Sequence, residues 1–303
     1  YQMVAAGLRN AGDIEAALQV ALRGLQKDDA SFFLRDAVLR YALELATSSP
    51  VYVAYRVAPA PRLETLRRAV DAFSPREAKL WSAQVPETLT TTALHLSYAH
   101  LLLREPSQAL EITEEAERYQ FDHAALVRAR MEALRDLGRP GDALASGESL
   151  LETMPFDALV FFAQTAADEN DVQRLAHAVS VGGARANQDQ SGGLSETLKG
   201  LQWGLLLRQG KEQDVAREAT ELGVLTSGSV PLLVQAARAF LQRRGDDSVN
   251  AANDYIAKAV DAAQAHSDPA NDYLVAQLMM QAKRYEEAAE RYEKIVPSGT
   301  LSE

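Results

Sequence analysis

The sequence predicts an all-α solenoid of about eight antiparallel helix hairpins. Two copies of one helical pattern follow each other between residues 92 and 155, and superimposing them pairs Ala109 with Ala143. The resulting period of about 34 residues is typical of helical repeat proteins, and it leaves room for about eight units in 303 residues. Apolar residues make up 47% of the chain and are dominated by Ala and Leu, which favours helices over strands.

The N-terminal part of the chain has regular helical spacing followed by one irregular stretch. Apolar residues recur at helical spacing over residues 2–27, where Gly12 interrupts the pattern and Asp13 is expected to cap the second helix. A further helix is expected over residues 32–45. Residues 50–62 are β-branched, aromatic and proline-rich, so we expect an irregular connector or a short helix there, with an edge strand or a docking segment as the alternative.

Helical spacing resumes before the two aligned repeats. It covers residues 62–73, and the motif SPRE at residues 74–77 then has the N-cap, first-turn proline and capping-box glutamate of a helix start. Residues 87–103 are predicted to form a long helix that leads directly into the repeats.

The C-terminal half contains further predicted hairpins. Their helices are expected over residues 156–167 and 171–181, 194–209 and 211–222, 230–243 and 249–265, and 269–282 and 285–296. Residues 182–193 carry a glycine pair at each end with polar residues between them, so we expect a flexible loop and a possible sub-boundary there. In the last helix, Glu287/Arg291 and Glu290/Lys294 are i,i+4 pairs expected on the solvent side.

Charge and composition exclude several classes of partner. The net charge of −11 disfavours nonspecific binding to phosphate backbones or anionic lipid, so no nucleic acid is expected as a partner. The absence of cysteine excludes disulfides, thiolate metal sites and cysteine nucleophiles. No uninterrupted apolar stretch approaches the ~20 residues of a membrane span, so we expect a soluble chain, cytoplasmic or periplasmic, without direct membrane insertion.

The chain begins at Tyr1 inside a helical pattern, without a charged-then-apolar leader. We therefore interpret residues 1–303 as one solenoid domain and as a fragment of a longer protein, whose other domains are further expected partners. Any targeting signal is then expected outside this sequence.

The pattern resembles the tetratricopeptide repeat family, in which small, aromatic and proline residues recur at fixed places. The last unit carries such residues at Ala276, Tyr285, Ala288, Tyr292 and Pro297, and the central unit carries Gly138, Ala143, Leu150 and Pro155. The resemblance covers about two thirds of the chain and implies a right-handed superhelix that holds a protein or peptide on its concave face.

On that resemblance, the ligand-facing side chains belong to the first helix of each pair. The expected concave face comprises His95, Tyr98, Leu102, Arg128, Glu132, Arg135, Gln202, Arg208, Tyr273 and Gln277. Tyr and Arg are frequent interface anchors, so the segment from His95 to Arg135 is the preferred docking site, with a solvated face as the alternative. The lysine-and-asparagine clamp with which some family members hold carboxyl-terminal peptides is absent from the corresponding positions.

No group of residues predicts catalysis or a cofactor. The five histidines contain no pair at the i,i+4 spacing of a helical zinc site. No serine stands in a GxSxG motif, and the glycines at 182–193 have neither a preceding strand nor a GK[ST] ending. We therefore expect no enzyme activity, no metal and no cofactor.

The sequence thus favours a protein-protein or peptide-binding scaffold module of a larger protein. Two alternatives stay open. The chain could be the sensor or regulatory arm of a bacterial signalling or defence protein, or a periplasmic scaffold in a polysaccharide or protein export machine. A nucleotide-binding or nuclease domain in the full-length protein would favour the first alternative, and a leader peptide or membrane anchor would favour the second.

Overall fold

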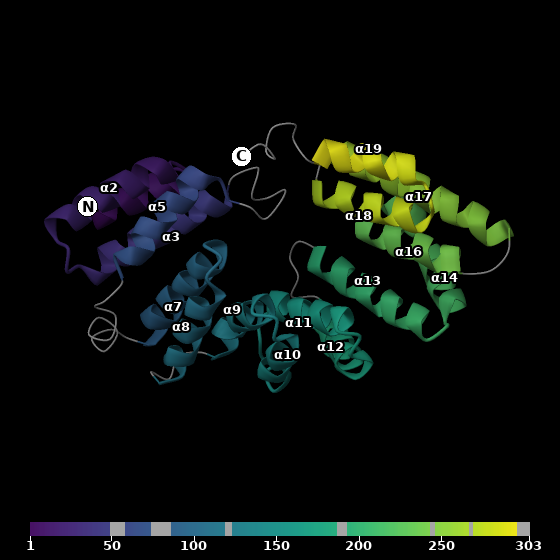
Figure 1. Ribbon diagram of the computed structural model, residues 1–303, viewed down its shortest axis with the longest axis horizontal. Coiled ribbons are helices and arrows are strands. Elements are labelled where there is room, and N and C mark those ends of the chain that lie inside the picture. Colours follow the sequence, from purple (N-terminus) through teal and green to yellow (C-terminus); the bar gives the residue numbers. More distant parts are fainter. Residues whose placement is uncertain are drawn as a thin grey trace. The chain divides into compact units, whose positions relative to one another are not determined.

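The structure is a computed structural model that describes residues 1–48, 58–73, 86–118, 123–186, 193–242, 246–266 and 269–295. Within these ranges it contains 17 α-helices and no β-strand, which confirms the predicted all-α fold (Figure 1). The chain divides into two compact units, unit 1 (Tyr1–Ala158) and unit 2 (Leu159–Glu303). No helix in the described ranges has the length and apolar character needed to cross a membrane.

Unit 1 consists of successive helix pairs. Its described helices are α1 (Gln2–Asn10) with α2 (Ile14–Lys27), α3 (Phe32–Thr47) with α5 (Ala60–Asp71), α7 (Pro86–Leu102) with α8 (Pro106–Arg118), and α9 (His123–Asp136) with α10 (Pro140–Glu148). Helices also contact members of the neighbouring pair, as α2 contacts α3 and α7 contacts α9. The buried faces of α1 to α9 therefore share one hydrophobic core, which extends from Ala5 to Leu126.

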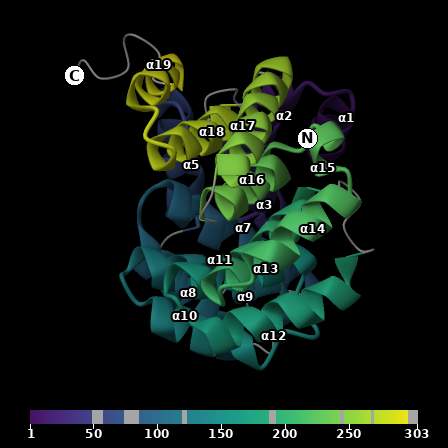
Figure 2. The same ribbon diagram turned by 90° about the vertical axis from the view of Figure 1, so that its right-hand side faces the viewer.

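Unit 2 continues the same arrangement. Its helices are α11 (Phe156–Asp168), which begins just before the division, with α12 (Val172–Ala184), α13 (Gly193–Arg208) with α14 (Glu212–Glu221), α16 (Val230–Gln242) with α17 (Asp246–His266), and α18 (Pro269–Gln281) with α19 (Tyr285–Ile295). The short helix α15 (Val224–Ser227) lies between α14 and α16. The first helices of neighbouring pairs contact one another, α16 with both α13 and α18 (Figure 2). The predicted succession of hairpins is confirmed.

The hairpins share one turn geometry. Within the described ranges, six of the turns that join the two helices of a hairpin contain a residue with a φ between 58° and 87°, at Gly12, Arg104, Gly138, Asn170, Gly210 and Lys283. The residue that follows each of them donates its backbone N–H to the carbonyl five positions earlier, at 2.8 to 3.0 Å. This is the hydrogen bond of a Schellman motif, which ends a helix with a left-handed residue. The predicted interruption at Gly12 is confirmed, as is the break between the helices predicted over 156–167 and 171–181.

The residue after the left-handed one starts the second helix. Asp13 and Asp171 stand there as N-caps, and their carboxylates each accept a backbone N–H of the first turn, at 2.9 and 3.0 Å. The predicted cap at Asp13 is therefore confirmed. Arg139 and Lys211 occupy the equivalent places before α10 and α14 and make no side-chain cap hydrogen bond, so these two helices start without that acceptor.

Four positions after the cap, each second helix buries a small or apolar side chain. These residues are Ala17, Ala109, Ala143, Leu175, Val215 and Ala288, none more than 1% exposed. Their N–H groups donate to the carbonyl of the cap residue, so the turn and the buried side chain keep a fixed register. Ala109 and Ala143, from which the period was predicted, are confirmed as equivalent. Small side chains at this place let the two helices approach closely.

Helix α12 runs through two glycines that the sequence pattern assigned to a loop. Gly182 is buried in the helix, and a Cβ added there would lie 2.4 Å from Cδ2 of Leu198 and 2.8 Å from Cδ2 of Leu159. This glycine therefore permits close packing of α12 against α11 and α13. The loop prediction is wrong for Gly182 and Gly183, and residues 187–192 lie outside the described residues. The possible sub-boundary at 182–193 stays a prediction.

Two further boundaries differ from the sequence prediction. Helix α17 begins at Asp246, so the predicted start at Val249 is too late. Helix α5 begins at Ala60 with a proline in its first turn, so the predicted irregular stretch over residues 50–62 ends earlier than expected. Residues 49–57 and the predicted helix start at 74–77 lie outside the described residues.

The terminal hairpin contains a buried arginine. Arg291 of α19 is 5% exposed, and its guanidinium pairs with the carboxylate of Asp272 on α18. Glu287, the predicted i,i+4 partner of Arg291, binds Arg284 instead. The predicted solvent-side pair of Glu287 and Arg291 is therefore wrong, because Arg291 lies on the face of α19 that packs against α18.

We expect the adjacent glycines of α12 to respond differently to alanine. Alanine favours a helix over glycine by about 1 kcal/mol, so Gly183→Ala, whose Cβ meets nothing within 4 Å, should stabilise unit 2. Gly182→Ala gains the same propensity but forces buried leucines to move, so it should be about 1–3 kcal/mol less stable than Gly183→Ala. Urea unfolding followed by circular dichroism measures this difference, and equal stabilities would contradict the close packing at Gly182.

A new N-cap at Lys211 should stabilise the hairpin of α13 and α14. Lys211→Ser supplies the acceptor that the first N–H groups of α14 lack, so the free energy of unfolding should rise by about 1 kcal/mol. Lys211→Ala is the control, because it removes the same side chain without adding an acceptor. The measurement is urea unfolding of unaltered chain and both variants, and a gain shared by serine and alanine would argue against capping as its cause.

Candidate functional site

The structure brings together one group of the predicted concave-face residues in unit 1. Arg128 of α9 donates from Nε to Oε1 of Glu132 at 2.9 Å and from Nη1 to Oδ2 of Asp157 at 2.8 Å. Burial alone would lower the pKa of Arg128, but the electrostatic effect of Glu132, Tyr98 and Asp157 raises this pKa above its ordinary value. Two carboxylates of the chain therefore already bind the guanidinium of Arg128.

Two other predicted residues, both on α7, face the inside of unit 1. Nδ1 of His95 lies 3.8 Å from Oδ1 of Asp36 on α3, and the His95 side chain is 20% exposed. The same oxygen of Asp36 accepts a hydrogen bond from Oγ1 of Thr92 at 2.8 Å. Leu102 packs against the hydrophobic core of unit 1. No group of three or more His, Asp or Glu side chains in the described ranges is placed to hold a metal ion.

The other predicted residues are spread over α9, α13 and α18. Arg135 is exposed near the end of α9, and Gln202 accepts a hydrogen bond from a lysine of its own helix at 3.0 Å. Tyr273 is 48% exposed, and its ring meets that of Tyr292 edge-on, with 5.9 Å between the centroids. Gln277 is partly buried on α18. Their part in binding stays a prediction.

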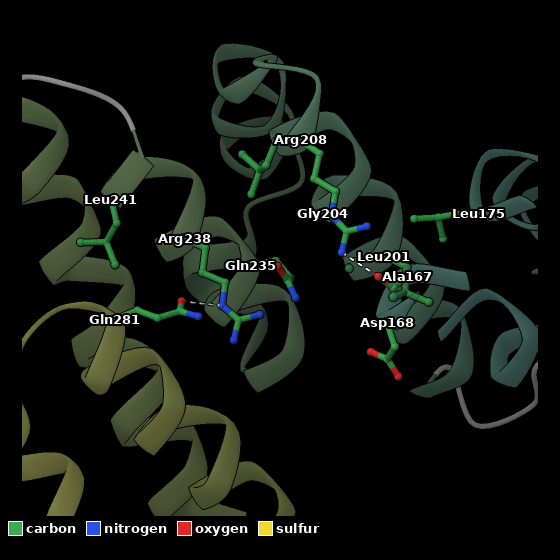
Figure 3. Close-up of a pocket in the computed structure, with 12 residues that line it drawn as sticks. Ala167, Asp168, Leu175, Leu201, Gly204, Arg208, Gln235, Arg238, Leu241 and Gln281 are labelled. Atoms are coloured by element: carbon green, nitrogen blue, oxygen red, sulfur yellow. Dashed lines mark hydrogen bonds between the residues drawn. The ribbon is translucent and has the colours of Figure 1, made fainter. Parts of the chain in front are cut away.

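Unit 2 contains a groove on the side formed by its first helices. The groove has a volume of about 570 Å³ and lies among α13, α16, α18 and the end of α11 (Figure 3). Its lining comprises Ala167, Asp168, Leu175, Gly200, Leu201, Gly204, Leu207, Arg208, Gln235, Arg238, Leu241 and Gln281. We call it the α13/α16 groove. Arg208 is the residue that both the sequence prediction and this lining contain.

Two glycines, one helical turn apart, lie on the α13 side of the groove. A Cβ added at Gly204 would meet nothing within 4 Å, and one added at Gly200 would lie 3.3 Å from Cγ of Gln235. Leu201 and Arg208 lie on the same face of α13, because residues three and four apart are neighbours on a helix. Gly204 thus leaves space next to the backbone of α13, whereas Gln235 already fills the space at Gly200.

Two guanidiniums line the groove and bind neutral oxygens. Nη2 of Arg208 donates to the backbone oxygen of Ala167 at 2.9 Å, and Nε of Arg238 donates to Oε1 of Gln281 at 2.9 Å. Within the described part of the chain, no carboxylate oxygen lies within 4.0 Å of either guanidinium. Burial therefore lowers the pKa of Arg238 below its ordinary value, without an opposing effect from a carboxylate. Asp168 lines the same groove with an exposed side chain.

The sequence reasoning missed Gln235, Arg238 and Gln281. A usable signal existed for the first two, because α16 is the first helix of its hairpin and its polar residues fall on the face that the repeat pattern assigns to ligands. The predicted set contained no residue of that hairpin. Gln281 lies 43 positions from Arg238, and no local pattern connects them.

A polar contact between α13 and α14 positions the glycine face of α13. Nε1 of Trp203, a fully buried residue, donates to Oε2 of Glu218 at 2.6 Å, and Nζ of Lys199 pairs with the same carboxylate. The Lys199 ammonium also lies 5.9 Å from the centroid of the Trp203 ring. Burial tends to raise the pKa of Glu218, but the hydrogen bonds from Lys199 and Trp203 hold it below its usual value.

Comparison by sequence matches the chain to no protein-family model and to no curated protein. Comparison by structure finds similarity to the crystal structure of yeast Tom70, with a TM-score of 0.54 and 12% identity over 94% of this chain and 55% of that chain. A monomeric IFIT1 mutant with Gppp-AAAA gives a TM-score of 0.43 and 14% identity over 97% and 68% of the two chains. The P58(IPK) TPR domain gives 0.29 and 15% over 97% and 90%.

These similarities concern the fold. Tom70 contains tetratricopeptide repeats, and its match extends over 94% of this chain. The chain spans about half the length of the Tom70 chain, 55% of it. The successive hairpins predicted from the sequence thus match the fold of Tom70, and the resemblance is confirmed at the level of the fold.

Unit 2 should lose stability in acid through Glu218. Because the folded-state pKa of Glu218 is lowered, its ionised form stabilises the fold above the usual glutamate pKa of about 4.3, and this contribution is lost as the pH falls through the lower folded-state pKa. The stability difference between unaltered chain and Glu218→Gln should therefore shrink below about pH 4.3. Urea unfolding followed by Trp203 fluorescence in a Trp81→Phe background measures it.

The matched control for this pH dependence is Glu221→Gln. Glu221 lies on the same helix with its side chain 66% exposed, and its nearest charge contact is 3.9 Å long. We expect the free energy of unfolding of this variant to equal that of the unaltered chain at every pH. A Glu218→Gln variant that also did so would contradict the contact with Trp203 and Lys199.

Proposed function

We propose that this chain binds a protein or peptide segment, and that the α13/α16 groove of unit 2 receives it. The fold supports the first part, because tetratricopeptide-like helical repeats typically mediate protein binding. The groove supports the second part, since its volume of about 570 Å³ falls within the range typical of ligand sites, roughly 300–1,000 Å³. The chain is proposed to be a binding module and not an enzyme.

The observation that carries this proposal is the free space next to Gly204. Packing needs a glycine where a Cβ would meet a neighbour, as at Gly182, but a Cβ at Gly204 would meet none. Glycine inside a helix costs about 1 kcal/mol relative to alanine, so helix stability does not favour it either. The backbone of a partner lying against α13 would use this space.

The remaining groove residues suit an extended chain. Leu201 and Leu241 line the groove and are partly buried, so they can contact apolar side chains of a partner. The amides of Gln235 and Gln281 each carry donors and an acceptor, which can bind the N–H and carbonyl groups of a peptide backbone. Such a mixture of apolar walls and a few polar groups is usual in binding sites.

The preferred docking segment of the sequence analysis, His95 to Arg135, receives less support. Its central guanidinium, Arg128, is already bound by Glu132 and Asp157. A partner would have to compete with these carboxylates or share the arginine with them. The α13/α16 groove offers arginines without that competition, so we place the binding surface there.

Filling the space next to Gly204 should prevent binding without unfolding the chain. Random linear peptides displayed on phage are selected against the immobilised full chain, and the affinities of selected peptides are measured by fluorescence anisotropy. Gly204→Leu should lower the affinity for these peptides by about tenfold or more, because the leucine side chain takes the place of the peptide. Leucine favours a helix over glycine, so circular dichroism should show an unchanged helix content.

Gly183→Leu is the matched control for Gly204→Leu. It makes the same change at an exposed helical glycine of α12, where a Cβ also meets nothing within 4 Å, but outside the groove. It should leave the affinities unchanged. The proposal is wrong if no peptide is selected, or if the selected peptides bind Gly204→Leu as tightly as the unaltered chain.

A further inference from the structure

Arg208 and Arg238 line one cavity, and neither guanidinium is paired with a carboxylate of the described chain. The chain contains 42 acidic and 31 basic residues, so carboxylates are in excess. Several arginines elsewhere in the described chain use them, and Arg128, Arg174 and Arg284 each pair with an Asp or Glu. The two groove arginines instead donate to neutral oxygens. Their charges are therefore available to a negatively charged partner.

Each groove guanidinium is held by an oxygen that a carboxylate can replace. Arg208 donates to a backbone carbonyl, that of Ala167, and Arg238 donates to the side-chain amide of Gln281. A carboxylate adds the attraction between two full charges to such a hydrogen bond, which a neutral oxygen does not. A guanidinium has five N–H groups, of which each arginine uses one in these bonds. A carboxylate from outside would thus bind without losing a better internal acceptor.

The two guanidiniums point toward different walls of the groove. Figure 3 shows Arg208 reaching toward Ala167 of α11, and Arg238 reaching toward Gln281 of α18. Helices α13 and α16, which carry the arginines, are in contact and lie between these two walls. A single carboxylate, such as the end of a peptide, would serve one arginine and leave the other. Two separate carboxylates match the two arginines.

We propose that the α13/α16 groove selects an extended segment with two acidic side chains, one bound by Arg208 and the other by Arg238. This inference rests on the proposed function and adds the chemistry of the ligand. The segment crosses α13 at Gly204, which leaves room for its backbone. In an extended strand each residue adds about 3.3 Å, so the two acidic residues can be separated along the segment.

Asp168 makes the two ends of the groove unequal. It lies beside Ala167, the residue that holds Arg208, and its exposed carboxylate lines the same cavity. Like charges repel, so the negative charge of Asp168 repels an acidic side chain bound at the Arg208 end of the groove but not one bound at the Arg238 end. Arg238 is therefore the stronger anchor, and Asp168→Asn should tighten the binding of acidic peptides.

The test compares peptides selected by the unaltered chain with those selected by the double variant Arg208→Gln, Arg238→Gln. Peptides fused to phage at their carboxyl end have no free terminal carboxylate, so side chains must supply the charge. Peptides selected by the unaltered chain should be enriched in separated Asp or Glu residues, and this enrichment should disappear with the double variant. Synthetic, amidated peptides in which one acid is replaced by its amide should bind about tenfold more weakly.

Gln281→Glu tests the Arg238 contact from within the chain. A glutamate at this position would pair with Arg238 and occupy the place of the ligand carboxylate, so acidic peptides should bind about tenfold more weakly. Arg217→Gln is the matched control for the arginine variants. It removes one positive charge from α14 outside the groove lining, where Arg217 pairs with Asp214 at 3.0 Å, and it should leave the affinities unchanged.

The inference is overturned if the selected peptides show no excess of acidic residues, or if that excess persists with the double variant. It is also overturned if Arg217→Gln weakens the peptides as strongly as Arg238→Gln does. Peptides that depend on Gly204 but not on acidic residues would remove this inference and leave the proposed function standing. Failure to select any peptide would remove both.

Discussion

The structure depends on the close approach of the two helices in each hairpin, which the turn and a buried small residue impose together. A left-handed residue such as Gly138 ends the first helix, and the residue after it fixes the start of the second. Four positions further on, a side chain such as Ala143 is fully buried. Short helices nucleate poorly, and the longest described helix has 21 residues, so each helix is stable because its neighbours cover it.

This constraint gives the two helices of a hairpin different tasks. The second helix places its small residues against the first, and its own neighbours bury much of what remains. The first helix has one face that does not pack against the second helix. Helix α13 shows this division between its two faces. On the face toward α14, Trp203 and Lys199 bind Glu218. On the other face, Gly204 and Arg208 line the groove. A groove on this side therefore costs the hairpin none of its packing.

Features set by residues close together in the sequence could be predicted, and features set by distant residues could not. The cap at Asp13 and the equivalence of Ala109 and Ala143 depend on a few neighbouring positions, and both were found from the sequence. Gly182 looks like a loop residue locally, but its place in α12 depends on Leu198 of the next helix. The spacing within α19 predicts that Arg291 is exposed to solvent, but in the fold it pairs with Asp272 of α18 and is buried.

Arg128 and Arg238 show why residue type and helix face alone do not identify a binding site. Both lie on first helices, and the repeat pattern treats them alike. A ligand carboxylate at Arg128 would exchange one charge-assisted hydrogen bond for another, because Glu132 and Asp157 already bind the guanidinium. At Arg238 it would replace a neutral amide oxygen and supply a negative charge to a partly buried positive one. Glu132 forms an i,i+4 pair with Arg128, which a local pattern can indicate. Asp157 and Gln281 stand 29 and 43 residues from their arginines, where no local pattern in the sequence indicates them.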